Sequence, residues 1–352
     1  MAKPRGFIEY GRVDPGHRSV EERLRDCREF ELPLPEDELH RQAARCMDCG
    51  IPYCHGAGCP VVNRIPDFKL DKSILDWRIE QMQAEGVEFQ TGVLVGEDLS
   101  PRYLQRISDA ICLAMGAGVP RDLTAPGRGL EGIHFAMDYL TPQNRAVSGE
   151  EAADGGETIS ARGKVVAVIG GGDTGSDCVG TANRQGAREV HQFEILPKPP
   201  AVASPETPWP TWPRMLRTSP SHEEGCHRRW AVMTRSFSGR GIHVDVLHGC
   251  EVDWAEGPKG WQMRPRPGTD FVLKVDLVLL AMGFIHVVHR GLVDALGVER
   301  DRRGNVAVDD HFMTSRQGVF AAGDTVEGAS LVVRAIHTGR RAAGAIDRWL
   351  RT

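Results

Sequence analysis

The chain has no long apolar run, few aromatic residues and no large excess of one charge. Of its 352 residues, 43 are Lys or Arg and 48 are Asp or Glu, which gives a net charge of −5. A nucleic-acid binder usually carries a basic surplus, so this near balance argues against a polyanion partner. No apolar run approaches the roughly 18 residues of a membrane span, and no apolar signal core follows the first basic residues. We therefore expect a cytoplasmic protein without a nucleic-acid or membrane partner.

Two residue types stand out against these absences, namely 40 glycines and nine cysteines. Four of the cysteines (Cys46, Cys49, Cys54 and Cys59) crowd into fourteen positions, and Pro60 follows the last of them. Thiolates at such spacing chelate soft or borderline metals, and iron–sulfur runs often end in Cys-Pro. The spacing favours an iron–sulfur cluster and leaves zinc or unligated thiols as alternatives. Cys112 and Cys178 are interpreted as small core residues.

Periodicity predicts an alternation of strands and helices over much of the chain. The mixed-charge run 21–29 is interpreted as a solvated helix face, Pro35 opens a helix, and a further helix begins near Asp71. Strands are expected at 87–90, 110–115, 164–169, 189–196 and 273–280, and a C-terminal helix at 331–350 with Leu331, Ala335, Ile336, Ala343, Ile346 and Leu350 in its core. Residues 141–162 are expected to form a loop or linker, and 197–225 to be irregular.

A glycine-rich turn directly follows the predicted strand 164–169. Gly170, Gly172 and Gly175 fit the pattern G-x-G-x-x-G, in which the first glycine allows a tight turn. The second lets the backbone approach a pyrophosphate, and the third lets the helix pack close to the strand. A helix that starts near Thr174 points its free N–H groups at the phosphates. The candidate nucleotide-binding residues are Gly170, Gly171, Gly172, Asp173, Thr174, Gly175 and Glu194.

The choice between NADH and NADPH stays open in the sequence. Glu194 ends the next predicted strand, where a carboxylate can accept a hydrogen bond from a ribose 2′-hydroxyl and so favour NADH. Several cations that could lie near would instead suit the 2′-phosphate of NADPH. These are Arg184, Arg188, Lys198, Arg214 and Arg217.

A second nucleotide signature lies near the end of the chain. Residues 318–324 form a short apolar run that ends in Gly323-Asp324, and Ser330 precedes the C-terminal helix. A carboxylate at such a strand end can meet a sugar or ribityl hydroxyl, while the helix N-terminus faces an electron-rich ring edge. The alternative is a surface turn in which Asp324 caps a helix.

Several longer runs resemble the small (beta) subunit of bacterial glutamate synthase, and the resemblance covers nearly the whole chain. The most specific runs combine prolines with tryptophans or histidine with glutamates. The matching runs are 46–54, 65–70, 132–138, 170–180, 208–213, 221–225 and 279–284.

The resemblance implies a flavoprotein that passes electrons from NADPH through FAD and four-iron clusters to a large subunit, which makes glutamate. It implies an α/β fold with two Rossmann-like dinucleotide-binding domains and a helical N-terminal iron–sulfur segment. Gly323 and Asp324 then resemble an FAD contact, and the four clustered cysteines resemble half of the cluster ligands. Hydride transfer between such cofactors needs no general acid or base, so no residue is assigned a catalytic role.

The chain also departs from the family pattern, which has an earlier glycine-rich turn for FAD and a second cysteine group. Both are absent, which indicates an internal deletion near Asn63-Arg64 of more than a βαβ unit (roughly 30 residues) and an incomplete FAD domain. An error in the recorded sequence would give the same pattern, and resequencing across Asn63 separates the two. The expected domains are 1–63 (iron–sulfur segment), 64–140 and 286–352 (parts of the FAD domain) and 141–285 (NAD(P)H domain).

Three functions are weighed. The first is the electron-input subunit of glutamate synthase, with its large (alpha) subunit as partner. The second is a flavin-reductase-like subunit of another oxidoreductase. The third is a non-catalytic remnant that binds NADPH or a partner.

Overall fold

The computed structural model describes residues 6–45, 65–70, 72–149, 158–202, 204–207, 214–257 and 260–352. These residues divide into two compact units. The first contains residues up to 45, 65–70 and 123–281, and the second contains 72–122 and 282–352. None of the helices in these ranges has the length and apolar character needed to cross a bilayer.

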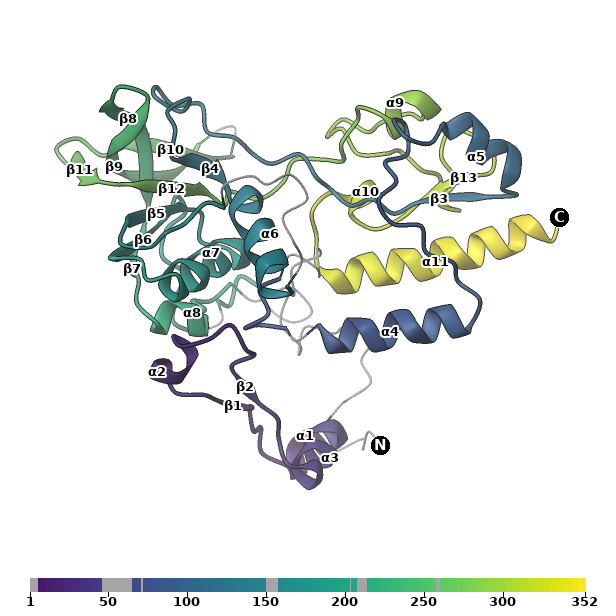
Figure 1. The fold of residues 1–352 in the computed structure, drawn as a ribbon, viewed down its shortest axis with the longest axis horizontal. Coiled ribbons are helices and arrows are strands. Elements are labelled where there is room, and N and C mark those ends of the chain that lie inside the picture. The colour runs from purple at the N-terminus through teal and green to yellow at the C-terminus, as the bar shows by residue number, and fades with distance from the viewer. Residues whose placement is uncertain are drawn as a thin grey trace. The chain divides into compact units, whose positions relative to one another are not determined.

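A five-stranded sheet forms the centre of the first unit (Figure 1). Every neighbouring pair in it is parallel. In spatial order its strands are β4 (Ile133–Phe135), β12 (Leu277–Leu280), β5 (Val165–Ile169), β6 (Glu189–Glu194) and β7 (His227–Trp230). All five residues of β5 are buried, as expected for a central parallel strand that is apolar on both faces. The strand predicted at 189–196 is confirmed and ends at Glu194.

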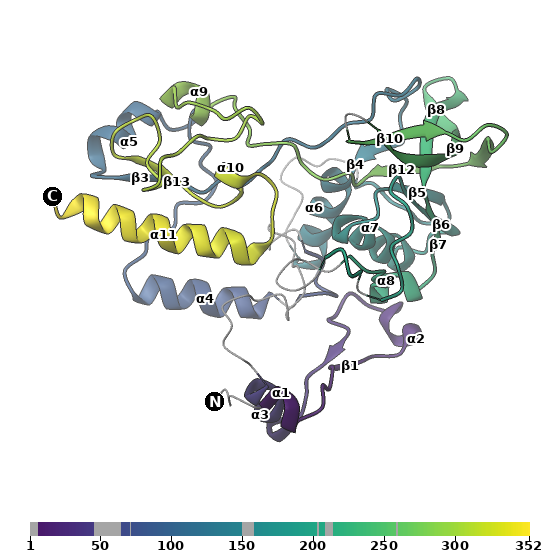
Figure 2. The same cartoon turned by 180° about the vertical axis from the view of Figure 1, so that it is seen from behind.

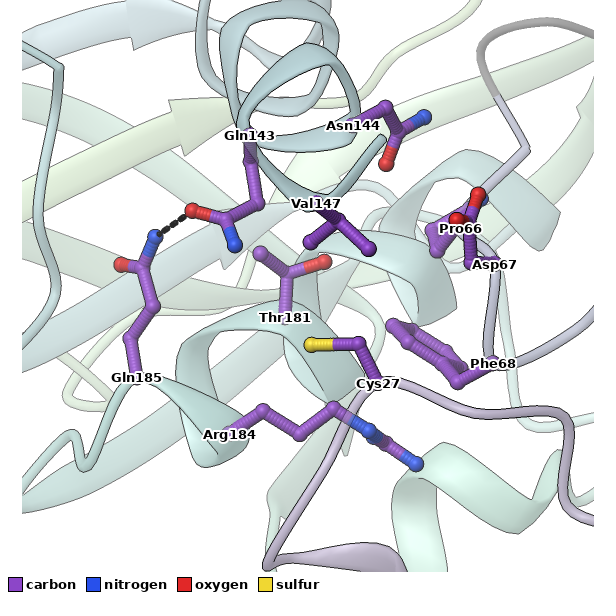
Figure 3. Close-up of a pocket in the computed structure, with 10 residues that line it drawn as sticks. All are labelled: Cys27, Pro66, Asp67, Phe68, Gln143, Asn144, Val147, Thr181, Arg184 and Gln185. Atoms are coloured by element: carbon purple, nitrogen blue, oxygen red, sulfur yellow. Dashed lines mark hydrogen bonds between the residues drawn. The ribbon is translucent and has the colours of Figure 1, made fainter. Parts of the chain in front are cut away.

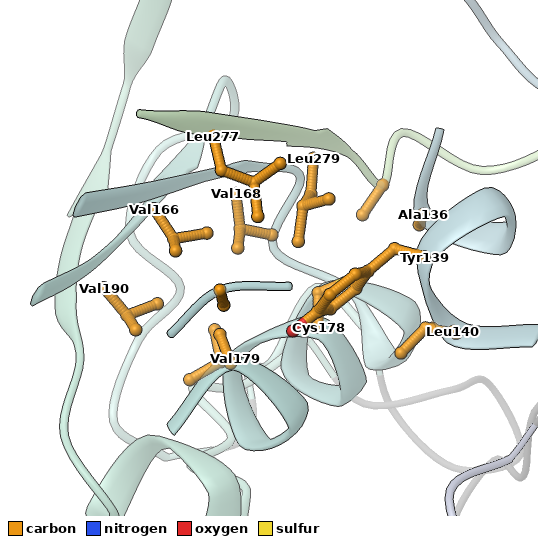
Figure 4. Close-up of a cluster of buried hydrophobic side chains, with 13 residues drawn as sticks. Ala136, Tyr139, Leu140, Val166, Val168, Cys178, Val179, Val190, Leu277 and Leu279 are labelled. Atoms are coloured by element: carbon orange, nitrogen blue, oxygen red, sulfur yellow. The ribbon is translucent and has the colours of Figure 1, made fainter. Parts of the chain in front are cut away.

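Helices α6 (Ala136–Val147) and α7 (Asp173–Arg184) cover one face of this sheet and enclose the main core (Figure 4). Val168 and Leu279 of the strands meet Cys178 of α7 and Tyr139 of α6 there, and all four are almost wholly buried. Each such side chain stabilises the fold by about 1.5–3 kcal/mol. The burial of Cys178 confirms its predicted role. Because α6 runs to Val147, the expectation of a loop from 141 onward is wrong for its first residues.

An antiparallel sheet forms a second layer of the first unit. Its strands are β8 (Val232–Arg240), β9 (His243–Gly257), β10 (Gly260–Pro265) and β11 (Phe271–Lys274), with β9 paired to the other three. The single strand predicted at 273–280 is wrong, because this stretch is split between two sheets. Asp276 lies in the short link between β11 and β12, where its carboxylate accepts a hydrogen bond from the backbone N–H of Val165 at 2.8 Å.

The N-terminal segment of the first unit contains short elements. They are α1 (Gly6–Glu9), β1 (Gly16–His17), α2 (Val20–Arg23), β2 (Glu31–Leu32) and α3 (Glu36–Ala44). The helix predicted to open at Pro35 is confirmed, with Pro35 as its N-cap. The interpretation of 21–29 as one solvated helix face is wrong, because α2 ends at Arg23 and that side chain is buried. The expectation that 197–225 is wholly irregular is also wrong, since α8 spans Pro220–Glu223.

The second unit is built around only two strands, β3 (Ile111–Leu113) and β13 (Val319–Ala321), which pair in parallel. Its helices are α4 (Ser73–Ala84), α5 (Pro101–Ile107), α9 (Leu292–Leu296), α10 (Asp324–Glu327) and α11 (Val332–Leu350). Figures 1 and 2 show α11 running along the two strands. The core of this unit is small and lies mainly between the strands and the α9 region.

Several predictions for the second unit need correction. The helix expected near Asp71 is confirmed as α4, but no strand forms at 87–90. Cys112 is exposed rather than part of the core. The predicted core face of α11 is also wrong, because Ile336 and Leu350 are 53% and 54% exposed while smaller residues are buried. The physical reason is that little in this unit packs against α11.

Candidate functional site

The glycine-rich turn lies between β5 and α7, as the sequence predicts. Gly170 has φ of 126°, a conformation that favours glycine, and its N–H donates to the carbonyl oxygen of Phe193 at 2.8 Å. A Cβ at Gly175 would lie 2.7 Å from Nε2 of Gln192 and far inside contact distance of the Gly170 carbonyl oxygen. Gly175 therefore allows the close packing of helix on strand that the motif implies.

Gly172 is the N-cap of α7, and its surroundings differ from those of Gly175. A Cβ built on Gly172 would meet no protein atom within 4 Å. Asp173 and Thr174 follow in the first turn, where the backbone N–H groups have no partner within the helix. The open space beside Gly172 and the positive end of the 12-residue α7 make a cradle that fits a phosphate group.

The carboxylate of Glu194 holds this turn in place. Its Oε2 accepts a hydrogen bond from the N–H of Gly171 at 2.7 Å, and its Oε1 accepts one from the N–H of Leu196 at 3.0 Å. A Cβ at Gly171 would press on the Glu194 carboxylate and force that side chain to move away from this hydrogen bond. Glu194 is thus engaged by the protein backbone at the place where the sequence expects a ribose contact.

The five cations considered for a 2′-phosphate separate into distinct groups. Arg184 and Arg188 lie at the far end of α7 and β6, paired with Glu224 and Asp276. Nη1 of Arg214 lies 3.8 Å from Oε2 of Glu206. Of the remaining two, Lys198 lies near Trp230, which pairs with Glu194 at the end of β6, and the backbone oxygen of Arg217 contacts Arg228.

Trp230 and Arg228, which the sequence did not single out, complete this group. Lys198 Nζ lies 5.0 Å from the centre of the Trp230 ring, and the Arg228 guanidinium carbon lies 4.8 Å from it. Both terminal nitrogens of Arg228 donate to the backbone oxygen of Arg217 at 3.2 Å. Burial lowers the pKa of Arg217 and of Arg228. The signal that could have found them is the parallel strand after β6, since its carboxyl end must lie beside Glu194.

In the second unit, the structure brings together the predicted residues Gly323, Asp324 and Ser330. Gly323 lies two residues after β13 with φ of 67°, and its N–H donates to the hydroxyl of Thr338 at 2.9 Å. Asp324 is 5% exposed, and its Oδ1 accepts a hydrogen bond from the Ser330 hydroxyl at 2.7 Å. Burial raises the pKa of Asp324, and the Ser330 hydrogen bond opposes this. Such burial does not fit the alternative of a simple surface turn.

These residues match only part of what a dinucleotide needs. Asp324 can meet a sugar hydroxyl, but α10, which it begins, has four residues. Within the described ranges, the second unit has no strand that leads through a glycine-rich turn into a long helix. The residues present therefore fit the sugar of a second nucleotide and do not fit its pyrophosphate. The candidate cluster ligands Cys46, Cys49, Cys54 and Cys59 lie outside the described residues.

A small pocket opens to solvent at the other end of α7 (Figure 3). Cys27, Phe68, Asn144, Thr181 and Arg184 contribute to its wall, and Figure 3 shows the dashed hydrogen bond between Gln143 and Gln185 beside them. The Arg184 guanidinium stacks on Phe68, with 3.7 Å from its carbon to the ring centre. Burial raises the pKa of the Cys27 thiol, so the group is not an activated nucleophile.

The family model of pyridine nucleotide-disulphide oxidoreductases matches residues 106–339 of this chain. The glutamate synthase [NADPH] small chain of Mycobacterium tuberculosis is 37% identical over an alignment that covers 99% of this chain and 96% of that protein. The glutamate synthase [NADPH] small chain of Azospirillum brasilense is 36% identical over 296 positions, which cover 82% of this chain and 58% of that protein.

These alignments bear on the expected deletion. The Mycobacterium alignment is 475 positions long and this chain has 352 residues, so at least 123 positions of it face no residue of this chain. The Azospirillum alignment needs almost no gaps, because 82% of 352 is about 289 residues in 296 positions. The Mycobacterium figures agree with residues that are absent from within this chain, as the expected deletion requires.

Among solved structures, M. tuberculosis FprA in complex with NADPH is similar with a TM-score of 0.60 and 17% sequence identity. The similarity covers 83% of this chain and 76% of FprA. At this identity it shows the fold alone, which is that of an α/β reductase with dinucleotide-binding units.

Proposed function

This chain belongs to the pyridine nucleotide-disulphide oxidoreductase family and, within it, to the glutamate synthase small chains, and we propose that it binds NADPH as an electron-input subunit. In this proposal the hydride of NADPH enters a path through FAD and iron–sulfur clusters to a large (alpha) subunit that makes L-glutamate from glutamine and 2-oxoglutarate. The observation that carries the proposal is the open cradle at Gly172 between β5 and α7. NADPH, when bound, supplies the hydride, and the residues of this chain bind and orient it.

The group of Lys198, Arg217 and Arg228 supports NADPH over NADH. Lys198 and Arg228 lie against Trp230, the last residue of β7, and Arg228 also contacts the backbone oxygen of Arg217. The adenosine end of the nucleotide lies at this end of the strands in such folds. Glu194, the residue that would favour NADH, already accepts two backbone hydrogen bonds. A 2′-phosphate in this place meets positive charge rather than a free carboxylate.

The proposed iron–sulfur ligands are Cys46, Cys49, Cys54 and Cys59. The proposal keeps FAD as the electron carrier of the family, with Asp324 and Ser330 as contacts to its sugar. Because the pyrophosphate part of that site does not fit, the chain by itself is expected to bind FAD weakly or not at all. This favours a second candidate function, in which the chain binds NADPH and a partner but does not transfer electrons alone.

Cofactor analysis of the purified chain separates these functions. Flavin, iron and sulfide are measured per mole of protein, and NADPH binding is followed by tryptophan fluorescence and melting temperature. Tight NADPH binding with dye reduction after reconstitution with FAD, iron and sulfide supports the electron-input role. Tight NADPH binding without dye reduction supports the second function. No response to NADPH in either binding signal refutes both.

A further inference from the structure

We infer that the exposed edge of strand β3 is a docking site for a separate polypeptide that adds a parallel strand to it. The expected partner carries the residues that the glutamate synthase small chains have and this chain lacks. The docking itself follows from the second unit, and only its expected consequence for flavin binding rests on the proposed function.

The two strands of the second unit have one closed edge and one open edge. On the far side of β13, the N–H of Ala321 donates to the carbonyl oxygen of Phe312 at 3.0 Å, and that of Thr314 donates to Val319 at 2.8 Å. On the other side, β13 pairs with β3. The outer edge of β3 has no strand paired to it among the described residues.

The hydrogen-bonding groups of β3 alternate between these two sides. The N–H of Ile111 donates to Gly318 at 2.9 Å, and the carbonyl oxygen of Leu113 accepts from Ala322 at 3.0 Å, so both residues face β13. Cys112, which lies between them, must direct its N–H and C=O groups toward the outer edge. Its side chain is exposed as well. An edge of this kind is a template for another strand.

A parallel sheet of two strands is itself an incomplete structure. Parallel sheets occur almost only with both faces covered, and isolated pairs of strands are marginally stable. The two strands present here share a small core on the α9 side, in which Leu113, Val319 and Ala321 are buried. The fold therefore gains stability from each parallel strand added at β3.

Exposed apolar side chains are somewhat more frequent in the second unit than its share of the described residues. In the described ranges, 25 large hydrophobic side chains are exposed, and 13 of them belong to this unit. Trp77 of α4 is 59% exposed, Ile107 of α5 is 59% exposed, and Ile336 of α11 is 53% exposed. These exposed apolar side chains are available for contact with a partner.

The large gap in the alignment indicates what covers these surfaces. At least 123 positions of the Mycobacterium protein face no residue of this chain, although the alignment covers 99% of the chain. In this inference, the residues that would pack on β3, α4 and α11 belong to these unmatched positions. A second copy lacks the same residues, so it cannot supply them. A polypeptide that contains them is the occupant that fits.

The test uses the segment of the M. tuberculosis small chain that faces the gap, produced as a separate polypeptide and added to the full chain. Hydrogen exchange at residues 111–113 is followed with and without this segment, and complex formation is measured by size-exclusion chromatography with light scattering. We expect a one-to-one complex in which the Cys112 amide becomes protected. The thiol of Cys112 should then react with a maleimide at least tenfold more slowly.

Variants at Cys112 give matched controls. Cys112→Pro removes the outward N–H of β3 and fixes its φ, and should weaken binding at least tenfold, whereas Cys112→Ala keeps the edge and should bind as the parent does. If Cys112→Pro does not fold, the exchange and maleimide measurements on the unaltered chain decide. Absence of a complex at saturating segment overturns the inference. A dimer of the chain alone with a protected Cys112 amide also overturns it, in favour of self-association.

The failure of this inference is distinguishable from the failure of the proposed function. NADPH binding is measured at Gly172 of the first unit without the added segment. NADPH binding without docking rejects the inference and leaves the nucleotide site in place. Docking without NADPH binding rejects the proposed function and supports the inference. If both hold, the complex should retain FAD that the chain alone loses on dialysis.

Discussion

Glu224, the C-cap of α8, accepts hydrogen bonds from both terminal nitrogens of Arg184 of α7, one of them at 2.9 Å. Arg23, from the N-terminal segment, reaches the same carboxylate at 3.5 Å. The side chains are 0%, 3% and 4% exposed. One buried carboxylate thus joins three separate parts of the first unit.

This arrangement predicts the effect of Glu224→Gln on stability. The substitution leaves the buried Arg184 guanidinium without a negative partner and leaves Arg23 only the half-exposed Glu223 carboxylate at 3.3 Å. Breaking a buried ion pair in this way typically costs about 3–5 kcal/mol. The free energy of unfolding, measured by urea titration with NADPH absent, should fall by that amount. Asp245→Asn is the matched control, because its partner Arg240 is 94% exposed and the change should cost about 1 kcal/mol or less. A loss equal to that of the control would contradict the buried network.

Two glycines of the nucleotide turn should respond differently to an added methyl group. Gly172→Ala places a Cβ in open space, so the melting temperature should stay unchanged while the Kd for NADPH rises about tenfold or more. Gly175→Ala places a Cβ against the Gly170 carbonyl, so it should destabilise the fold by about 1–3 kcal/mol. Calorimetry with nucleotide titration measures both effects. An unchanged Kd for Gly172→Ala would contradict the cradle.

Nucleotide preference should depend on the cations near Trp230. Lys198→Gln removes a charge that can bind a 2′-phosphate, and such a hydrogen bond contributes about 1.5–3 kcal/mol. The Kd for NADPH should therefore rise about tenfold or more, while the Kd for NADH should stay within about twofold. Arg228→Gln should act in the same direction. Arg188→Gln is the control, since Arg188 pairs with Asp276 at the opposite end of the sheet. Equal losses for both nucleotides would refute the assignment.

The first unit could largely be predicted from the sequence, because β5, the glycine turn and α7 each have a local pattern. The antiparallel sheet could not, for a physical reason. The pairing of β8 with β9 shifts register between Thr234 and Ser236 and again between Ser238 and Gly239. Each shift breaks the alternation of inward and outward residues by which a strand is recognised.

In the second unit, the sequence predicts a helix correctly but predicts its buried face wrongly. The pattern of α11 predicts a buried face that includes Ile336 and Leu350, yet both are exposed. The spacing of apolar residues predicts which face of a helix is suited to burial. In the second unit, little packs against that face of α11, so its apolar residues stay exposed. The contacts of Arg23, Trp230 and Arg228 could not be predicted either, because each depends on which distant segments the fold brings together.

His222 of α8 should make stability depend on pH. Its Nδ1 accepts a hydrogen bond from the N–H of Ser219 at 3.0 Å, and burial lowers its pKa to about 4 from an ordinary value of 6.5. The nearby charges of Arg228 and Lys69 act in the same direction. Because the unfolded chain takes up this proton more readily than the folded one, the contribution is complete above pH 6.5 and is lost as the pH falls toward 4.

Urea titrations between pH 4 and 7 measure this dependence. His222→Asn keeps an acceptor for the Ser219 N–H and removes the titrating group, so the free energy of unfolding should change less steeply with pH than in the parent. His311→Asn, at an exposed position of the second unit, is the control and should keep the slope of the parent. If the two variants have the same slope, His222 is protonated equally in the folded and unfolded states, and the buried neutral imidazole is refuted.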